Sequence, residues 1–328
     1  MSANDVSQLA VNGGPKVRTQ PWPGRALFGE EEKAAAVALF DEAIRTGSAF
    51  GYNGPVEEAY CREFADYLGG GYADAVNSGS SAVYVALRSL KLEPFTEVIC
   101  PAITDPGGIM PIVLMNCIPI VADARPGSYN IGPDQIAECL SERTSAILVA
   151  HICGEPADMD PILEIARSRG IPVVEDCAQA HGARYKGRLV GTMGEVGAFS
   201  TMSGKHHATA AQGGVVFTKS EERYWEARRC SDRGKPFGIE GGGSNVIAAP
   251  NLNLNDLAAA VGRVQIKKLD GIVARRRRVA AAIHEGLKRS QVVSAGWEPE
   301  GAEPSYWFLR LHVDAGKITV SGDAFASA

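Results

Sequence analysis

Three short polar segments of this sequence carry residue types that could cooperate in covalent chemistry. They are Asn77-Ser-Gly-Ser-Ser81, Ile171-Pro-Val-Val-Glu-Asp-Cys-Ala-Gln-Ala-His-Gly182 and Phe199-Ser-Thr-Met-Ser-Gly-Lys-His-His207. Each contains or directly follows a short apolar run of the kind that forms a buried strand. The position of each polar group at a strand end decides which chemistry it predicts.

Lys205 is the candidate nucleophile. It emerges from the end of a predicted strand, where desolvation lowers the pKa of an amine and lets it form a Schiff base. An isolated lysine is far more often a solvated surface residue, so Lys205 alone does not establish a site.

Asp176 lies at the carboxyl end of another predicted strand, the end that faces the ligand crevice in parallel sheets. A buried carboxylate there needs a cation or several hydrogen-bond donors to stay ionised. A structural salt bridge explains Asp176 equally well.

Gly79 and Ser80 lie where a turn enters a predicted helix, and free amides at a helix N-terminus suit a phosphate. A serine N-cap without any ligand is the alternative. The segment is neither a Walker A loop nor a GxGxxG motif.

Two other polar clusters are less specific. His206 and His207 are adjacent, so their side chains diverge, and no HxxxH or CxxC pattern supports them; we expect no metal site. The four arginines at 275–278 indicate a solvated helix face, an inter-subunit contact or a contact to a nucleotide diphosphate.

The elements that must position these groups alternate between strands and helices, which predicts an α/β fold with a mostly parallel sheet. The last strand follows too closely for a crossover helix, so we expect it to run antiparallel. We expect an N-terminal arm with two helices (1–70), a sheet domain (71–219), and a long helix with part of a small α+β domain (220–328). The expected strands are 97–100, 118–121, 145–150, 171–174, 196–200, 214–218 and 307–313, and the expected helices are 30–45, 56–68, 80–90, 133–140, 161–169 and 255–288.

Composition excludes several classes of protein. The 328 residues are 45% hydrophobic and 22% charged, as in globular enzymes, and the net charge of −5 argues against a nucleic-acid partner. No apolar run is long enough to span a membrane, and the N-terminus lacks the apolar stretch of a signal peptide. The seven cysteines are scattered, so we expect a reduced, cytoplasmic protein.

Four features occur in an order that resembles fold-type I pyridoxal-phosphate enzymes. They are Ser-Gly-Ser, then Val-Glu-Asp-Cys-Ala-Gln-Ala-His-Gly-Ala, then a serine five residues before Lys205, and last Gly213-Gly214 before a strand. More narrowly, they resemble the DegT/DnrJ/EryC1/StrS sugar aminotransferases. The resemblance runs from Gly13 to Phe308. The chain ends at the start of a predicted helix, where family members generally continue, so the resemblance implies a C-terminally truncated chain with an incomplete small domain.

The resemblance implies a role for each matching residue. Lys205 would bond to the cofactor, Asp176 would pair with its pyridine nitrogen, and Gln179 would lie beside its phenolic oxygen. Gly79, Ser80 and Ser200 would hold the phosphate, and Asn251 would reach the phosphate of the neighbouring subunit in a homodimer with shared active sites. His181, His206 and Tyr306 are expected near the substrate.

Several positions depart from the family pattern. Asp105 stands in the cofactor site where the family usually stacks an aromatic residue on the ring, and Gly204 replaces the usual threonine or serine before the lysine. Asn253 replaces an arginine, and the 231–234 segment lacks a histidine. These changes leave the cofactor chemistry intact but leave the substrate open.

The resemblance implies an aminotransferase of amino-sugar biosynthesis that moves an amino group from glutamate or glutamine to a keto-sugar, nucleotide-linked or not, or to a keto-cyclitol. A sugar dehydratase of the same family, which carries a histidine in place of the lysine, is one alternative. A non-catalytic regulatory protein is another. A nicotinamide oxidoreductase is disfavoured because the glycines at 191, 194 and 197 have the wrong spacing.

Overall fold

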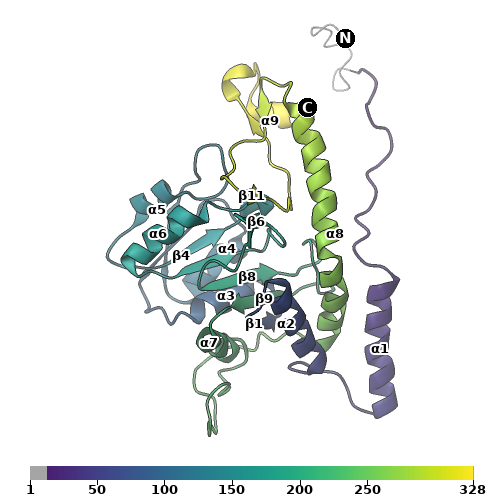
Figure 1. The fold of residues 1–328 in the computed structure, drawn as a ribbon, viewed down its shortest axis with the longest axis vertical. Helices are drawn as coiled ribbons and strands as arrows, with labels where there is room; N and C mark the ends of the chain where they lie inside the picture. Colours follow the sequence, from purple (N-terminus) through teal and green to yellow (C-terminus); the bar gives the residue numbers. More distant parts are fainter. Residues whose placement is uncertain (1–12, 328) are drawn as a thin grey trace.

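The structure is a computed structural model that describes residues 13–327. Residues 1–12, the first part of the expected arm, lie outside the described residues. A seven-stranded sheet forms the centre, in the order β1-β9-β8-β5-β4-β2-β3 (Figure 1). Its strands are β1 (Tyr72–Val76), β2 (Glu97–Pro101), β3 (Ile118–Ala122), β4 (Thr144–Ala150), β5 (Val173–Asp176), β8 (Val196–Ser200) and β9 (Gly214–Thr218).

The strand directions confirm the α/β prediction. The neighbouring strands from β3 to β8 pair in parallel, whereas β9 pairs antiparallel with both β8 and β1. The short connection before β9 therefore makes this strand antiparallel to its neighbours, as expected. With β9 excepted, the strands end at one edge of the sheet, and the polar segments identified above leave the sheet there.

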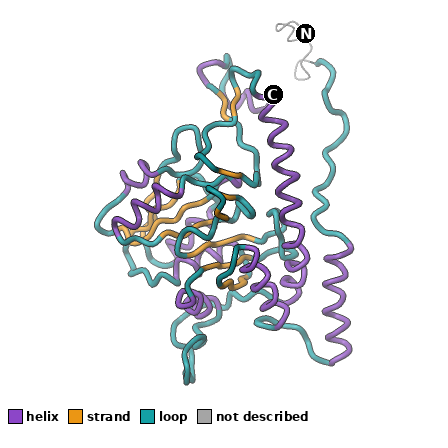
Figure 2. Tube along the Cα trace, in the orientation of Figure 1, coloured by secondary structure: helices purple, strands orange, loops and turns teal. Residues whose placement is uncertain are grey.

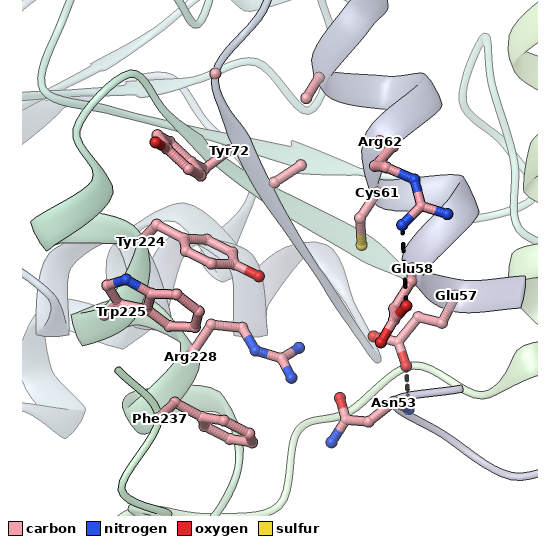
Figure 3. A pocket seen from close by; sticks show the side chains of 13 residues that line it. Asn53, Glu57, Glu58, Cys61, Arg62, Tyr72, Tyr224, Trp225, Arg228 and Phe237 are labelled. Atoms are coloured by element: carbon pink, nitrogen blue, oxygen red, sulfur yellow. Dashed lines mark hydrogen bonds and ion pairs between the residues drawn. The ribbon is translucent and has the colours of Figure 1, made fainter. Parts of the chain in front are cut away.

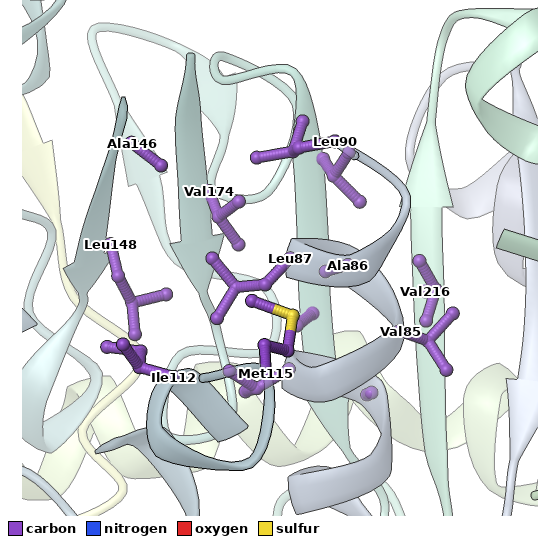
Figure 4. Close-up of a cluster of buried hydrophobic side chains, with 14 of the residues drawn as sticks. Val85, Ala86, Leu87, Leu90, Ile112, Met115, Ala146, Leu148, Val174 and Val216 are labelled. Atoms are coloured by element: carbon purple, nitrogen blue, oxygen red, sulfur yellow. The ribbon is translucent and has the colours of Figure 1, made fainter. Parts of the chain in front are cut away.

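Helices cover both faces of the sheet. On one face, α3 (Gly79–Arg88), α4 (Pro106–Leu114) and α7 (Glu221–Ser231) enclose the apolar cluster shown in Figure 4, where Leu87 and Ile112 are fully buried against Leu148 and Val174. On the other face, α5 (Pro133–Cys139) and α6 (Met159–Arg169) cover one half and α2 (Pro55–Tyr67) and α8 (Asp256–Leu287) the other. Burial on both faces explains why these strands are continuously apolar.

Two helices were missed by the sequence prediction. The first turns of α4 contain Pro106, Gly107 and Gly108, which have poor helix propensity, but apolar packing of Ile112 overrides it. The second is α7 (Glu221–Ser231), which lies where no helix was expected; the Ser220 side chain caps it by accepting from Arg223 N.

The first and last parts of the described chain lie along α8. Helix α1 (Glu30–Thr46) packs beside α8, and the segment before it extends along the same helix (Figures 1 and 2). The strand expected at 307–313 is reduced to β12 (His312–Val313), which pairs with β10 (Val293–Ser294). β11 (Ala302–Glu303) joins β6 (Arg184–Tyr185) and β7 (Arg188–Leu189) in a separate small sheet, and the described chain ends in α9 (Gly322–Ser327). No described helix is both long and apolar enough to cross a membrane.

Candidate active site

A cavity of about 240 Å³ opens at the carboxyl edge of the parallel strands. Its wall brings together residues that follow β1, β2, β5 and β8, although they are far apart in the sequence. It includes Gly79, Ser80, Asp105, Asp176, Ser200 and Lys205 among the residues that the sequence singled out. The cavity therefore contains an amine, two carboxylates and a helix N-terminus.

Lys205 is only 7% exposed. Its backbone amide donates to Met202 O at 2.8 Å, which closes a tight turn after β8 and directs the side chain into the cavity. Burial lowers the pKa of the Lys205 amine below its ordinary value, and the nearby carboxylates of Asp176 and Asp105 partly oppose this shift. The amine is thus more readily available as a nucleophile than that of a surface lysine.

Two residues that the sequence analysis did not single out hold the Lys205 loop. The Trp307 ring lies under the amine, with Nζ 3.5 Å from the ring centroid, and Trp307 Nε1 donates to Gly204 O at 2.9 Å. Arg25 donates to the carbonyl oxygens of Ser203 and Lys205 from the opposite end of the chain. Trp307 lay within the region of resemblance, but nothing in the sequence placed it on the lysine.

Asp176 is also 7% exposed, at the end of β5. Burial raises its pKa, while the amide of Ala178, which donates to Oδ1 at 2.9 Å, and the charge of Lys205 lower it. The second oxygen faces Gly108, where an added Cβ would lie 3.1 Å from Oδ2. Oδ2 is therefore placed to pair with a protonated nitrogen that enters the cavity.

The N-terminus of α3 forms the opposite end of the cavity. Ser78, rather than Ser80, is the N-cap residue, since its side chain accepts from Ser81 N at 3.1 Å. The first amides of a helix have no intrahelical acceptor, so Gly79 and Ser80 present N–H groups there together with the Ser80 hydroxyl. An added Cβ on Gly79 would lie 2.5 Å from Ser200 Cβ, so only glycine allows this close approach to β8. The arrangement suits a phosphate.

Asp105 lines the same cavity as the N-cap of α4, where its Oδ1 accepts from Gly107 N at 2.8 Å. Gln179 lies outside the cavity wall, and its Oε1 accepts from Cys153 N at 2.7 Å. Asn251 is exposed and its Oδ1 accepts from Asn253 Nδ2 at 2.6 Å. The roles that the sequence assigned to these residues stay predictions.

The three residues expected near the substrate do not line this cavity. His181 is buried and donates from Nε2 to Ser200 O at 2.8 Å; burial lowers its pKa to about 4, so it is neutral near pH 7. His206 is buried below the loop and donates to Ser305 O at 3.0 Å. Tyr306 lines a separate cavity beside Arg276 on α8. In this structure the two histidines anchor the segment around Lys205 through their hydrogen bonds to the carbonyl oxygens of Ser200 and Ser305.

A buried cluster of His151, Glu175 and Cys177 has ligand atoms close enough together for a metal ion. Its hydrogen-bonding groups are already used, however. Glu175 accepts from the backbone amides of Gly191, Met193 and Gly194 and from His151 Nε2, and His151 Nδ1 accepts from Ala157 N. The cluster therefore fixes the strand end next to Asp176, and we assign it a structural role.

Comparison with known proteins identifies the chain's family. Residues 30–320 match the model of the DegT/DnrJ/EryC1/StrS aminotransferase family. The chain belongs to this family.

Individual members agree with this assignment. The L-glutamine:2-deoxy-scyllo-inosose aminotransferase of Streptoalloteichus tenebrarius is 31% identical over 97% of this chain and 75% of its own length. The L-glutamine:scyllo-inosose aminotransferase of Streptomyces griseus is 29% identical over 92% of this chain and 73% of its own. The solved aminotransferase of Psychrobacter cryohalolentis superposes with a TM-score of 0.84 at 28% identity, covering 93% of this chain and 80% of its own.

DegT/DnrJ/EryC1/StrS aminotransferases use pyridoxal 5′-phosphate, so this chain is a pyridoxal-phosphate-dependent aminotransferase of fold type I, as predicted. The cavity fits that cofactor: the N-terminus of α3 would hold the phosphate, Asp176 would face the pyridine nitrogen, and Lys205 would reach the aldehyde carbon. When bound, the cofactor supplies an electron sink for a carbanion at the amino acid Cα. Within that site, Lys205 Nζ is the group that can move a proton, because burial lowers its pKa.

Proposed function

We propose that this aminotransferase moves the amino group of L-glutamine to the ketone of a cyclitol related to scyllo-inosose. The cavity that joins Lys205, Asp176 and the N-terminus of α3 is the observation that carries the catalytic part of this proposal. The named activities of several relatives, each about 30% identical over most of the chain, support the choice of glutamine and a keto-cyclitol.

Lys205 would act in both halves of the reaction. Its amine would take the proton from the Cα of glutamine in the first half, and in the second half it would give a proton to the cyclitol carbon that receives the amino group. Trp307 would hold the amine over the cavity, since its ring lies against Nζ and its indole nitrogen is fixed to Gly204 O. Asp176 would keep a positive charge on the ring nitrogen throughout.

The dehydratase alternative needs a histidine where Lys205 stands. The nearest candidate, His206, is buried with Nε2 bonded to Ser305 O and does not line the cavity. This arrangement favours amino transfer over dehydration.

The decisive experiment follows the nitrogen. The purified chain with pyridoxal phosphate should transfer label from L-[α-¹⁵N]glutamine to 2-deoxy-scyllo-inosose, detected as a mass increase of the aminocyclitol. The same mixture of cofactor and substrates without the protein is the control for non-enzymatic exchange. Label that appears only in a nucleotide-linked keto-sugar offered in parallel would reject the cyclitol, and no transfer to either acceptor would favour the non-catalytic alternative.

We also propose a homodimer with shared active sites. Large apolar side chains are exposed on α1, where Ile44 is 79% exposed, and on α4, where Leu114 is 71% exposed, and such faces are typical of subunit interfaces. Asn251 does not line the cavity of its own chain, which is compatible with a role at its neighbour's phosphate. The seven free cysteines support a reducing, cytoplasmic location.

Mixed dimers test the shared site. Lys205→Ala and Asn251→Ala chains should each be nearly inactive alone, but mixing them should restore about a quarter of wild-type activity. Random pairing makes about half of the dimers mixed, and each of these has one intact site of two. Sedimentation must first show that both variants dimerise. If Asn251→Ala is inactive alone and the mixture gains nothing, Asn251 serves its own chain.

A further inference from the structure

A second cavity, of about 400 Å³, lies away from the active site (Figure 3). It is enclosed by α2, the first residues of β1, α7 and the loop after α7, and it shares no lining residue with the cavity of Lys205. Strand β1 separates the two, since Tyr72 at its start lines this cavity and the turn after its end leads to Gly79. None of the roles proposed above uses this cavity.

One wall of the cavity is aromatic. The rings of Tyr72 and Tyr224 stack with centroids 5.3 Å apart, and Tyr224 lies 4.7 Å from Trp225. Phe237 adds a ring beneath the guanidinium of Arg228, whose central carbon lies 4.5 Å from the ring centroid. Figure 3 shows these rings facing the side chains of α2 across the cavity. Aromatic faces of this kind attract organic cations and the C–H faces of saturated rings.

The opposite wall carries a carboxyl group that has no cationic partner among residues 13–327. Arg62 pairs with Glu58 at 3.9 Å, and Arg228 pairs with Asp74 at 2.7 Å. Glu57 is 1% exposed and forms no ion pair with a described residue; one of its oxygens accepts from Asn53 N, and Oε1 has no hydrogen-bond partner among the described residues.

Two further polar atoms of the lining are buried without a partner among the described residues, the acceptor Asn53 Oδ1 and the donor Arg228 Nε. Buried polar groups are normally paired, and each exception needs an explanation. A ligand hydroxyl, which both donates and accepts, would match this combination of a free acceptor and a free donor.

The electrostatics around Glu57 favour a cation. Burial raises the pKa of Glu57 to about 8; Asn53 N and Arg228 oppose this shift, whereas Asp74 and Asp256 add to it. The groups that face Glu57 are Glu58, Cys61 and Arg62 on α2, Asp74 on β1, Arg228 on α7 and Asp256 on α8. Since the arginines already have acidic partners, an added positive charge is what the cluster lacks.

We propose that this second cavity binds a small hydroxylated ring that carries a primary ammonium group. The ammonium would pair with Glu57, the ring would lie against Tyr224 and Trp225, and hydroxyls would meet Asn53 and Arg228. Amino sugars and aminocyclitols have this chemistry, so the natural ligand would be a product of the reaction proposed above; the existence of the site does not depend on that function.

Calorimetry on the full chain can test the site with two matched probes. These are trans-2-aminocyclohexanol, which has the ammonium, and trans-cyclohexane-1,2-diol, which does not. The cofactor is first reduced onto the protein with borohydride, so that the amine cannot react with it. We expect one amine per chain and at least tenfold weaker binding of the diol. Equal binding of both probes, or no binding of the amine, would overturn the proposal.

Variants then locate the binding. Glu57→Gln keeps an acceptor for Asn53 N but cannot ionise, and at pH 8.5, where Glu57 is mostly ionised, it should weaken amine binding at least tenfold. Glu58→Gln, on the same helix and already paired with Arg62, should change binding less than twofold. Unchanged affinity in Glu57→Gln would place the amine elsewhere. If Glu57→Gln does not fold, Trp225→Leu takes its place, and undiminished binding in that variant would reject the aromatic wall.

The pH dependence gives a further readout. A proton and the ligand ammonium compete for Glu57, whose pKa of about 8 leaves it mostly protonated at pH 6.5 and mostly ionised at pH 8.5. The probe stays mostly charged over this range, so its affinity should rise about twentyfold with pH. In Glu57→Gln the affinity should not vary with pH. Because turnover is not measured, these results stand or fall separately from the aminotransferase assay.

Discussion

Replacing Lys205 with alanine will lower kcat/KM by at least about 10⁴. The variant loses a proton-transfer group worth about 10²–10⁴ on its own, and it also loses the one amine that the described residues contribute to the cavity wall. The fold should survive, because the hydrogen bonds of Lys205 to Met202 and Arg25 use its backbone atoms and alanine retains these. Steady-state kinetics and an unchanged unfolding temperature check both parts.

Chemical trapping gives the same prediction a second measurement. Wild-type protein with pyridoxal phosphate should be yellow, and borohydride should attach the cofactor irreversibly to the peptide that contains Lys205. Lys219→Ala is the matched control, since Lys219 is exposed just after β9, and it should trap and turn over normally. A label on another lysine, or substantial activity in Lys205→Ala, would show that the nucleophile is wrongly assigned.

Changing Asp176 to asparagine will lower kcat by about 10²–10³ while cofactor binding persists. This is the scale of losing one preorganised electrostatic partner in a buried site, and the amide cannot stabilise a protonated pyridine nitrogen as a carboxylate does. Binding should persist because the phosphate end of the cavity, at Gly79 and Ser80, is unchanged. Single-turnover kinetics with glutamine separates the chemical step from binding.

Asp123→Asn is the control for this variant. Asp123 directly follows β3 in the same sheet but is exposed and outside the cavity wall, so its replacement should leave turnover within about twofold. Near-normal single-turnover rates in the Asp176→Asn variant would mean that Asp176 has only a structural role. Loss of cofactor binding would instead show that Asp176 anchors the cofactor rather than tuning it.

The local sequence predicted the candidate catalytic residues and most strands of the central sheet. The short β-branched runs and the glycine turn before α3 encode their structures through nearest neighbours, so six of the seven central strands, the antiparallel β9 among them, and the N-terminus of α3 follow from the sequence alone. The polar residues after β5 and β8 meet because strands that run in parallel end at one edge. Asp176 and Lys205 were therefore found from position and residue type.

Long-range packing decided what the sequence left open. Trp307 and Arg25 reach the Lys205 loop from more than a hundred residues away on either side, and no local pattern encodes such contacts. His181 and His206 follow the motif residues closely, yet Phe64 and Phe199 pack against His181, His181 packs against His206, and both histidines are buried outside the cavity. The carboxyl of Glu57, which forms no ion pair with a described residue, likewise depends on how α2, α7 and β1 pack. Local periodicity fixes elements and strand ends, whereas the surroundings of a side chain depend on which distant segments cover it.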